Sequence, residues 1–308
     1  MMRIAIAGTC GLAQMIAHYV QEQTSHQLVL FSREANQQLA DRGFEVLVVD
    51  YDDAQSLHYA LKGVDTVIST VTGQPQINLI VAAANNRVRR FAPAEFEGSP
   101  GLRPENDPLD RGKAQAWQLL QQWRNWIPES CVFTCGVLYE RFAPGGLKEC
   151  HISRNSEIAG EGDYILNLRN MTADVPWCDD QGNYACIGMT AASDVGRFVV
   201  RALDMPQWPT ELRMCGDRMA VHELLALAQV VRGAQFNPAQ MRTTSQLRQE
   251  IPYAQYAGDT ARQLRLHTLI ATSEGRYDVT EPNLNALFPD IQPLKFREWL
   301  TTYWGPMT

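Results

Sequence analysis

The chain has 308 residues, of which 45 % are hydrophobic, and its formal net charge is -7 at pH 7. This length fits one large domain or two smaller ones with a sizeable core. The acidic balance argues against broad binding to a nucleic-acid backbone, which needs a positive surface. The local basic group Arg87, Arg89 and Arg90 is expected to be a solvated entry to a strand.

Cysteine and histidine usage indicates neither a disulfide framework nor a metal site. The seven cysteines form no C-x-x-C pair, and the six histidines show no ligand spacing. Reduced thiols in a cytoplasmic protein are therefore the expectation. No apolar stretch reaches 18 residues, and Gly8 and Gly11 interrupt the N-terminal apolar run. We expect no membrane span, no signal peptide and no membrane partner.

The first half of the chain alternates between apolar, strand-like runs and helical patterns. Leu12, Ile16 and Val20, for example, recur at helical spacing. Strands separated by helices indicate βαβ units and a parallel sheet covered on both faces, so we predict an α/β, doubly wound Rossmann fold. The expected strands are residues 3–7, 28–31, 44–49, 64–69, 88–92 and 131–138.

After about residue 145 this alternation loosens, and turns such as residues 160–163 and 180–183 separate strand-like pieces. We expect residues 146–308 to form mainly a smaller, variable α+β domain. The helix near residues 194–204, with Ser193 or Asp194 as its N-cap, is expected to pack back on the first sheet. Further helices are expected at residues 221–231 and 296–303.

A glycine turn follows the first strand. Gly8 and Gly11 have the spacing G-x-x-G, which permits a tight turn and lets a pyrophosphate approach the N–H groups at a helix N-terminus. A third glycine would normally stand where this chain has Gln14, which leaves the loop geometry open. An ordinary β-to-α turn is the alternative. The predicted cofactor contacts of this segment are Gly8, Thr9, Cys10, Gly11 and Leu12.

Polar residues stand at the ends of the second and third strands. Ser32 and Arg33 offer a hydroxyl and a guanidinium where an NAD-binding chain prefers an acidic residue. These groups suit a 2′-phosphate and favour NADP(H) over NAD(H), although a solvated arginine beside Glu34 is the alternative. Asp50 and Tyr51 close the third strand, where an adenine ring would lie, and a structural turn explains them as well.

The fourth and fifth strands end in two further candidate segments. Thr70 and Val71 follow the fourth strand and are expected to meet the cofactor through backbone groups. The fifth strand runs into a segment that would lie over the reactive end of the cofactor. Its predicted cofactor contacts are Pro93, Ala94, Glu95 and Phe96.

Lys113 is the candidate catalytic residue and a further cofactor contact. It opens the long helix, 17 residues after Phe96. A lysine beside a nicotinamide ribose can hold the cofactor and can give or take a proton at a developing alkoxide or enolate. Position 109 is Leu109, so no Tyr-x-x-x-Lys pair supports a tyrosine-based mechanism. A solvated helix lysine is the alternative.

These features resemble the NmrA-like and isoflavone-reductase-like group of atypical short-chain dehydrogenases. The most specific phrase, R-F-A-P-A-E-F at residues 90–96, is similar to the family's R-F-x-P-S-E-F-G. The glycine turn, Arg33, Lys113 and the segments 134–139 and 193–196 also match. The resemblance covers most of the chain and is strongest from residue 1 to residue 145.

The resemblance implies an NADP(H)-binding Rossmann domain at residues 1–145 and a mainly substrate-binding domain at residues 146–308. It also implies that Lys113 is the acid–base group. Two departures from the family phrase would alter the floor of the nicotinamide pocket, since Ala94 replaces the usual serine and Glu97 replaces the glycine after Phe96.

We therefore expect an NADPH-dependent reductase of a small, aromatic or cyclic secondary metabolite, with hydride transfer to a C=C, C=N or C=O group. Two other functions stay open, an NADP(H)-sensing regulatory protein and a pathway enzyme for a redox-neutral step such as cyclisation. Ordinary core packing is the alternative for the four aromatic residues that would line a substrate pocket. These candidate substrate residues are Tyr139, Phe142, Tyr164 and Trp177.

Overall fold

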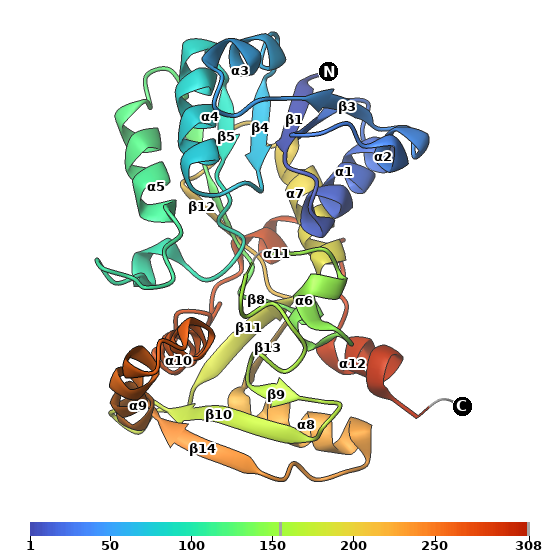
Figure 1. Cartoon of the computed structure of the whole chain (residues 1–308). Coiled ribbons are helices and arrows are strands. Elements are labelled where there is room, and N and C mark those ends of the chain that lie inside the picture. Colours follow the sequence, from blue (N-terminus) through green and yellow to red (C-terminus); the bar gives the residue numbers. More distant parts are fainter. Residues whose placement is uncertain (154–155, 307–308) are drawn as a thin grey trace. The chain divides into compact units, whose positions relative to one another are not determined.

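The computed structural model describes residues 1–153 and 156–306. The chain divides into two compact units. Figure 1 shows the chain coloured by residue number. We expected one boundary after residue 145, whereas the observed division is discontinuous because the chain passes between the units several times. The first unit is Met1–Phe96, Asp110–Thr134 and Val195–Leu212; the second is Glu97–Leu109, Cys135–Asp194 and Arg213–Thr308.

The first unit contains a six-stranded parallel sheet in the order β3-β2-β1-β4-β5-β6. This order, which reverses between β1 and β4, is that of a doubly wound Rossmann sheet, and it confirms the predicted fold class. The strands are β1 Arg3–Ala7, β2 Gln27–Ser32, β3 Glu45–Val48, β4 Thr66–Ser69, β5 Arg90–Ala92 and β6 Glu129–Ser130.

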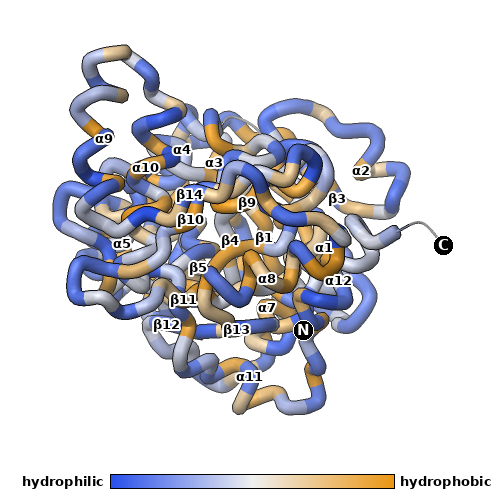
Figure 2. Tube along the Cα trace, turned by 90° about the horizontal axis from the view of Figure 1, so that it is seen from below, coloured by the Kyte–Doolittle hydropathy of each residue, from blue (hydrophilic) through white to orange (hydrophobic). Residues whose placement is uncertain are grey.

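Helices cover both faces of this sheet (Figure 1), which is why its central strands β1 and β4 are almost fully buried and mostly apolar. β1 and β4 appear hydrophobic along the trace in Figure 2, and Ile4, Ile6 and Val67 are fully buried. Helices α3, α4 and α5 pack side by side. The helices of this unit are α1 Gly11–Gln23, α2 Gln37–Asp41, α3 Ala54–Ala60, α4 Gln74–Asn85, α5 Lys113–Gln122 and most of α7 Ala192–Leu203.

Helix α7 packs on α1 of the first unit, and its expected packing on the sheet itself stays a prediction. A side chain at Gly196 would lie 2.7 Å from the ring of Tyr19 and 3.1 Å from the carbonyl of Met15. The helix begins at Ala192, before the two expected N-cap residues. Its first turn is capped instead by Glu140, whose carboxylate accepts a hydrogen bond from the Ala192 amide at 3.0 Å.

The expected strand at residues 131–138 is wrong, because it is two strands in different sheets. β7 (Val132–Thr134) pairs with β12 (Glu211–Arg213), whereas β8 (Val137–Leu138) pairs with β11 (Cys186–Thr190). Gly136 separates them with a φ of +67°, and a Cβ there would lie 2.0 Å from the Gly188 carbonyl. Only glycine allows both this backbone conformation and this approach.

The second unit is built around two small sheets, β14-β10-β9 and β13-β11-β8. Their hydrophobic core includes side chains from α8, α10 and α12. The remaining elements are α6 Gly146–Glu149, β9 Leu166–Asn167, β10 Thr172–Cys178, β13 Asp217–Ala220, α8 Val221–Arg232, β14 Ala239–Thr243, α9 Thr244–Tyr256, α10 Thr260–Ser273, α11 Asn283–Leu287 and α12 Phe296–Trp304, with short 3₁₀ turns at Pro100–Leu102 and Tyr139–Phe142.

All seven cysteines lie among the described residues and are free thiols. No helix in the described part of the chain is long and apolar enough to cross a membrane. The same residues contain no cluster of three or more His, Cys, Asp or Glu side chains that could hold a metal ion.

Arg90 is not the solvated residue that we expected from the basic segment 87–90. Its side chain is 1 % exposed, and its Nε donates to the carboxylate of Glu129 at 2.7 Å. The two terminal nitrogens donate to the carbonyls of Leu203 and Met205, each at 2.6 Å. Arg90 therefore ties β5 and β6 to the C-terminal end of α7.

Replacement of Arg90 with Met should lower the free energy of unfolding by about 3 kcal/mol, because the partly buried carboxylate of Glu129 and two carbonyls lose their charged donor. Urea denaturation followed by circular dichroism measures this change. Arg87→Met is the matched control, since Arg87 is exposed and the change in the free energy of unfolding should stay within about 0.5 kcal/mol. Equal unfolding midpoints for the two variants would contradict the assigned role of Arg90.

Candidate active site

The glycine turn after β1 is held by a close approach of two strand ends. Gly8 has a φ of +105°, and a Cβ at this position would lie 2.4 Å from Oγ1 of Thr70. That hydroxyl donates to the Ala7 carbonyl at 2.9 Å, so Thr70 cannot move aside without losing this bond. The turn therefore requires glycine at position 8 for both its backbone conformation and its space.

The first turn of α1 has no side-chain cap. Its N-cap residue is Cys10, which makes no capping hydrogen bond, so amides of this turn are available to an anion. Gln14, at the position of the usual third glycine, donates to the Thr9 carbonyl at 2.9 Å and accepts from Arg42 at 2.7 Å. The loop geometry that the sequence left open is thus fixed by the Gln14 side chain.

Arg33 and Tyr51 lie together with Gly8 at the ends of β2, β3 and β1. The Arg33 side chain is exposed, whereas Tyr51 is only 4 % exposed. Burial raises the pKa of the Tyr51 hydroxyl, and the charge of Arg33 and the nearby Gly8 amide oppose this rise. The Gly8 amide itself donates to the Phe31 carbonyl at 3.0 Å. Within the described residues, the buried Tyr51 hydroxyl has no hydrogen-bond partner.

The turn after β3 is stabilised by local hydrogen bonds. The Asp50 carboxylate accepts from the Asp52 amide at 2.9 Å, and Asn78 of α4 donates to the Tyr51 carbonyl at 2.9 Å. These bonds account for Asp50 as a turn residue, which was the alternative explanation at this position. Ser32 makes a comparable local contact, in which its hydroxyl accepts from the Glu34 amide at 3.4 Å.

The segment after β5 is largely buried and is held by side-chain contacts. Pro93, Ala94 and Glu95 are buried, and the ring of Phe96 stacks on Phe133 with 6.0 Å between ring centroids. The Ala94 amide donates to Oε1 of Gln76 at 2.7 Å. Gln76, in the first turn of α4, is a contact of this segment that the sequence analysis missed, because no motif marks it.

Lys113 is a buried residue and not a solvated helix lysine. It is 3 % exposed, and its Nζ lies 3.9 Å from a carboxylate oxygen of Glu95, which is 1 % exposed. Asp110 places the helix that carries it, since its carboxylate accepts from the Ala114 amide at 2.9 Å and the Gly112 amide at 3.2 Å. An aspartate before a helical pattern is an N-cap signal, and it could have identified Asp110 from the sequence.

The predicted site residues of the first unit thus form two groups along the carboxyl edge of its sheet. Gly8, Arg33 and Tyr51 belong to the group at β1, β2 and β3. Glu95 and Lys113 belong to the group that follows β5. The remaining predicted cofactor contacts lie at the strand ends and in the turns between these groups, and their role as contacts stays a prediction. They are Thr9, Cys10, Gly11, Leu12, Ser32, Asp50, Thr70, Val71, Pro93, Ala94 and Phe96.

The structure places three of the four candidate substrate residues in the core of the second unit. Tyr139, Phe142 and Tyr164 are each at most 3 % exposed. The Tyr139 hydroxyl donates to the Leu294 carbonyl at 2.9 Å, and that of Tyr164 pairs with Thr272 at 2.9 Å. This packing agrees with the alternative explanation for these residues.

Trp177, the fourth candidate, lies near the surface of the same unit. It is partly exposed and packs edge-on against Tyr184, with His222 completing a small aromatic group. A role of Trp177 in binding a substrate stays a prediction.

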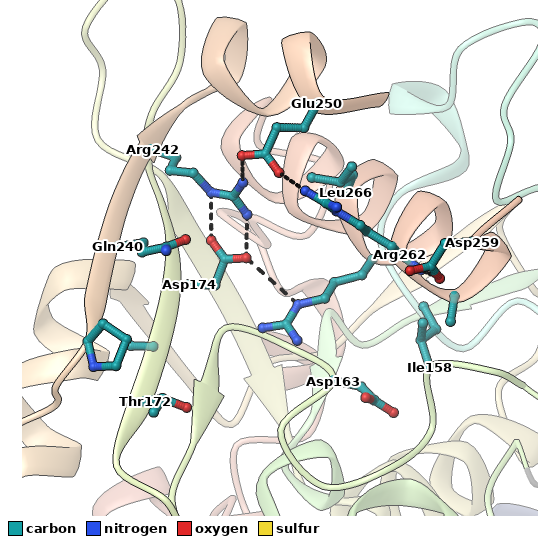
Figure 3. Close-up of a pocket in the computed structure, with 14 residues that line it drawn as sticks. Ile158, Asp163, Thr172, Asp174, Gln240, Arg242, Glu250, Asp259, Arg262 and Leu266 are labelled. Carbon is teal, nitrogen blue, oxygen red and sulfur yellow. Dashed lines mark hydrogen bonds and ion pairs between the residues drawn. The ribbon is translucent and has the colours of Figure 1, made fainter. Parts of the chain in front are cut away.

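A polar pocket of about 530 Å³ lies in the second unit, lined by residues of β10, β14, α9 and α10 (Figure 3). Its guanidinium groups are largely neutralised by its carboxylates. Arg242 binds both Asp174 and Glu250, and Arg262 donates to Glu250 at 2.9 Å. Among the described residues that line this pocket, none is a predicted site residue.

Glu140, the residue that caps α7, is a partly buried carboxyl whose pKa is raised. Burial raises its pKa from the usual 4.5 to about 7, and the neighbouring carboxylate of Asp194 adds to this rise. The Ala192 amide, which donates to Glu140, acts in the opposite direction. Between pH 4.5 and about pH 7, Glu140 stays protonated in the folded state but is ionised in the unfolded state. The free energy of unfolding therefore falls as the pH rises through this range.

Glu140→Gln should remove this pH dependence, because an amide oxygen can still accept from Ala192 but does not titrate. At pH 8 we expect the variant to exceed the wild type in free energy of unfolding by up to about 3 kcal/mol, and at pH 4 we expect little difference. Denaturant titrations at both pH values give this comparison. A difference that does not change with pH would contradict the assignment.

Three comparisons with known proteins extend over nearly the whole chain. Residues 2–300 match the model of the NmrA-like family. The chain is 26 % identical over 321 residues to the oxidoreductase BOA1 of Botryotinia fuckeliana (strain B05.10), an alignment that covers 97 % of this chain and 98 % of that protein.

Solved structures show the same fold. Leucoanthocyanidin reductase from Vitis vinifera, in a binary complex with NADPH, matches with a TM-score of 0.73 and 18 % identity over 98 % of this chain and 99 % of that one. The triphenylmethane reductase of Citrobacter sp., complexed with NADP(H), matches with a TM-score of 0.67 and 16 % identity over 98 % and 99 % of the two chains. With the family model matched over residues 2–300, this protein belongs to the NmrA-like family.

Proposed function

We propose that this protein is an NADPH-dependent reductase of a small metabolite, with Lys113 as its acid–base group. The observation that carries the proposal is the buried Lys113–Glu95 pair at the carboxyl end of β5. It belongs to the same unit as the glycine turn and Arg33. A cofactor that binds across the carboxyl edge of a doubly wound sheet would place its reactive end near such a pair.

The residues of the first unit fit the chemistry of a phosphorylated dinucleotide. The backbone at Gly8 has no side chain to hold a phosphate away, and the first turn of α1 presents amides without a side-chain cap. Arg33 is exposed and can pair with a 2′-phosphate. The buried hydroxyl of Tyr51, which lies near the Gly8 amide and has no hydrogen-bond partner among the described residues, would supply a further donor beside them.

When bound, NADPH supplies a hydride. The protein must then provide or orient a proton where negative charge develops on the substrate, and a lysine ammonium has both the charge and the proton. The 3.9 Å contact with Glu95 restricts the position of Lys113 Nζ. Because both side chains are almost completely buried, little water surrounds them to screen the ammonium.

The names of similar proteins support the same chemistry. The fungal relative is called an oxidoreductase. The two structures described above are reductases in complex with NADPH or NADP(H). We propose an aromatic or cyclic secondary metabolite as the substrate, with the reducible bond a C=C, C=N or C=O group.

Arg33→Ala should weaken NADPH binding about ten- to a hundredfold, because the 2′-phosphate loses a charge-assisted contact. Binding of NADH, which has no such phosphate, should change little. Titration followed by nicotinamide fluorescence measures both affinities. Arg124→Ala, which changes an exposed arginine of the same unit, is the control and should leave both affinities at wild-type values. Equal weakening of NADPH and NADH in the Arg33 variant would contradict the role of Arg33.

Lys113→Arg should keep the positive charge beside Glu95 but replace the ammonium with a guanidinium, which does not give up its proton. We expect NADPH affinity to stay within a few-fold of the wild type, while turnover falls about 10²- to 10⁴-fold. Consumption of NADPH, measured with a substrate found by screening phenolic and cyclic carbonyl compounds, reports the turnover.

Lys62→Arg serves as the control for the Lys113 variant, since Lys62 is exposed and should tolerate the same change. Wild-type turnover by the Lys113 variant would remove Lys113 from its proposed role.

A further inference from the structure

Gln76 is a fully buried amide side chain in the first turn of α4. It is 0 % exposed, and its Oε1 accepts the hydrogen bond from the Ala94 amide at 2.7 Å. An N–H group can donate only to the oxygen of a carboxamide, so this bond fixes which of its two polar atoms is which. The Nε2 group, on the same carbon atom as Oε1, therefore lies immediately beside the Ala94 backbone.

This Nε2 group has no hydrogen-bond partner within residues 1–153 and 156–306. A buried donor that makes no hydrogen bond costs about 1–3 kcal/mol of stability. Such groups are rare in folded proteins and call for an explanation. The two N–H donors of the Gln76 amide therefore form no hydrogen bond with the described residues of the protein.

The surroundings of this amide are the predicted reactive end of the cofactor site. Ala94, which has no side-chain acceptor, stands where the family phrase has serine. The next residue is Glu95, whose carboxylate pairs with Lys113 at 3.9 Å. The starts of α4 and α5 also meet here, since a Cβ at Gly112 would lie 3.4 Å from the Cα of Gly73. Gln76 and Lys113 are therefore carried by neighbouring helix starts at the end of β5.

We propose that Gln76 recognises the nicotinamide half of the cofactor, by donating a hydrogen bond from Nε2 to an acceptor oxygen of the nicotinamide nucleoside. This inference rests on the proposed function, and it adds a specificity-determining residue to it. The acceptor is a neutral oxygen of the carboxamide or the ribose, because a neutral amide donor suits such an oxygen, whereas Arg33 and the first turn of α1 suit the phosphates.

The decisive variant is Gln76→Glu, since glutamate keeps the shape of the side chain and an oxygen for the Ala94 amide but removes the Nε2 donor. Isothermal titration calorimetry on the full-length protein should compare two ligands, NADPH and adenosine 2′,5′-bisphosphate, which lacks the nicotinamide half. We expect NADPH to bind about tenfold more weakly. The affinity for adenosine 2′,5′-bisphosphate should stay within about twofold of the wild type.

Gln74→Glu is the matched control. It makes the same chemical change two residues earlier in α4, at an exposed side chain that donates to Asn78 at 2.8 Å. Both ligands should bind this variant as they bind the wild type. Gln76→Met, which adds no buried charge, is the second variant and decides the question if Gln76→Glu does not fold. It should show the same selective loss of NADPH affinity.

The outcomes separate this inference from the proposed function. Wild-type affinity for both ligands in Gln76→Glu or Gln76→Met would mean that Nε2 binds only a buried water, and it would overturn the inference. Equal weakening of both ligands would indicate a purely structural role and would overturn it as well. Failure of the wild type to bind either ligand would overturn the proposed function and this inference together.

Discussion

The close approach of β1 and β4 at Gly8 is the constraint on which the rest of the first unit depends. The sheet order reverses between these two strands, so the chain that leaves β1 and the chain that leaves β4 turn toward opposite sides. Their ends meet because Gly8 has no side chain to collide with Thr70. A side chain at position 8 would push apart the strand ends from which both halves of the candidate site are built.

Two buried polar groups lie on either side of this reversal, and within the described residues neither has a hydrogen-bond partner. Tyr51 follows β3 on one side, and Gln76 contacts the segment after β5 on the other. Each costs the folded protein some stability. In the proposed complex with a dinucleotide, each half of the cofactor would meet one of these groups, and binding would offset this cost. Lys113 and Glu95 add a buried charge pair beside the second group.

Much of the first unit could be predicted from the sequence, because its signals are local. Five of the six expected strands have counterparts in the parallel sheet, within one or two residues at each end. The single strand expected at residues 131–138 is wrong because Gly136, whose φ is +67°, bends the chain close to the Gly188 backbone. A hydropathy pattern does not show such a bend. The helices at 244–256 and 260–273 were not identified, although Thr243 and Asp259 cap them. Neither helix has a continuous apolar stripe, because α9 buries only Thr244, Leu247 and Ala254, whereas residues 268–273 of α10 are buried on all sides.

The sequence by itself determined the Rossmann fold class, the glycine turn and the candidate roles of Arg33 and Lys113, because a strand, a turn and a helix start are encoded by neighbouring residues. Only the tertiary structure decided which distant groups meet. Gln76 binds the amide of Ala94, Glu140 caps a helix that begins 52 residues later, and Arg90 is buried where its sequence neighbourhood suggested solvent. Such contacts depend on packing between elements far apart in the chain, and a local pattern of hydrophobic and polar residues does not record them.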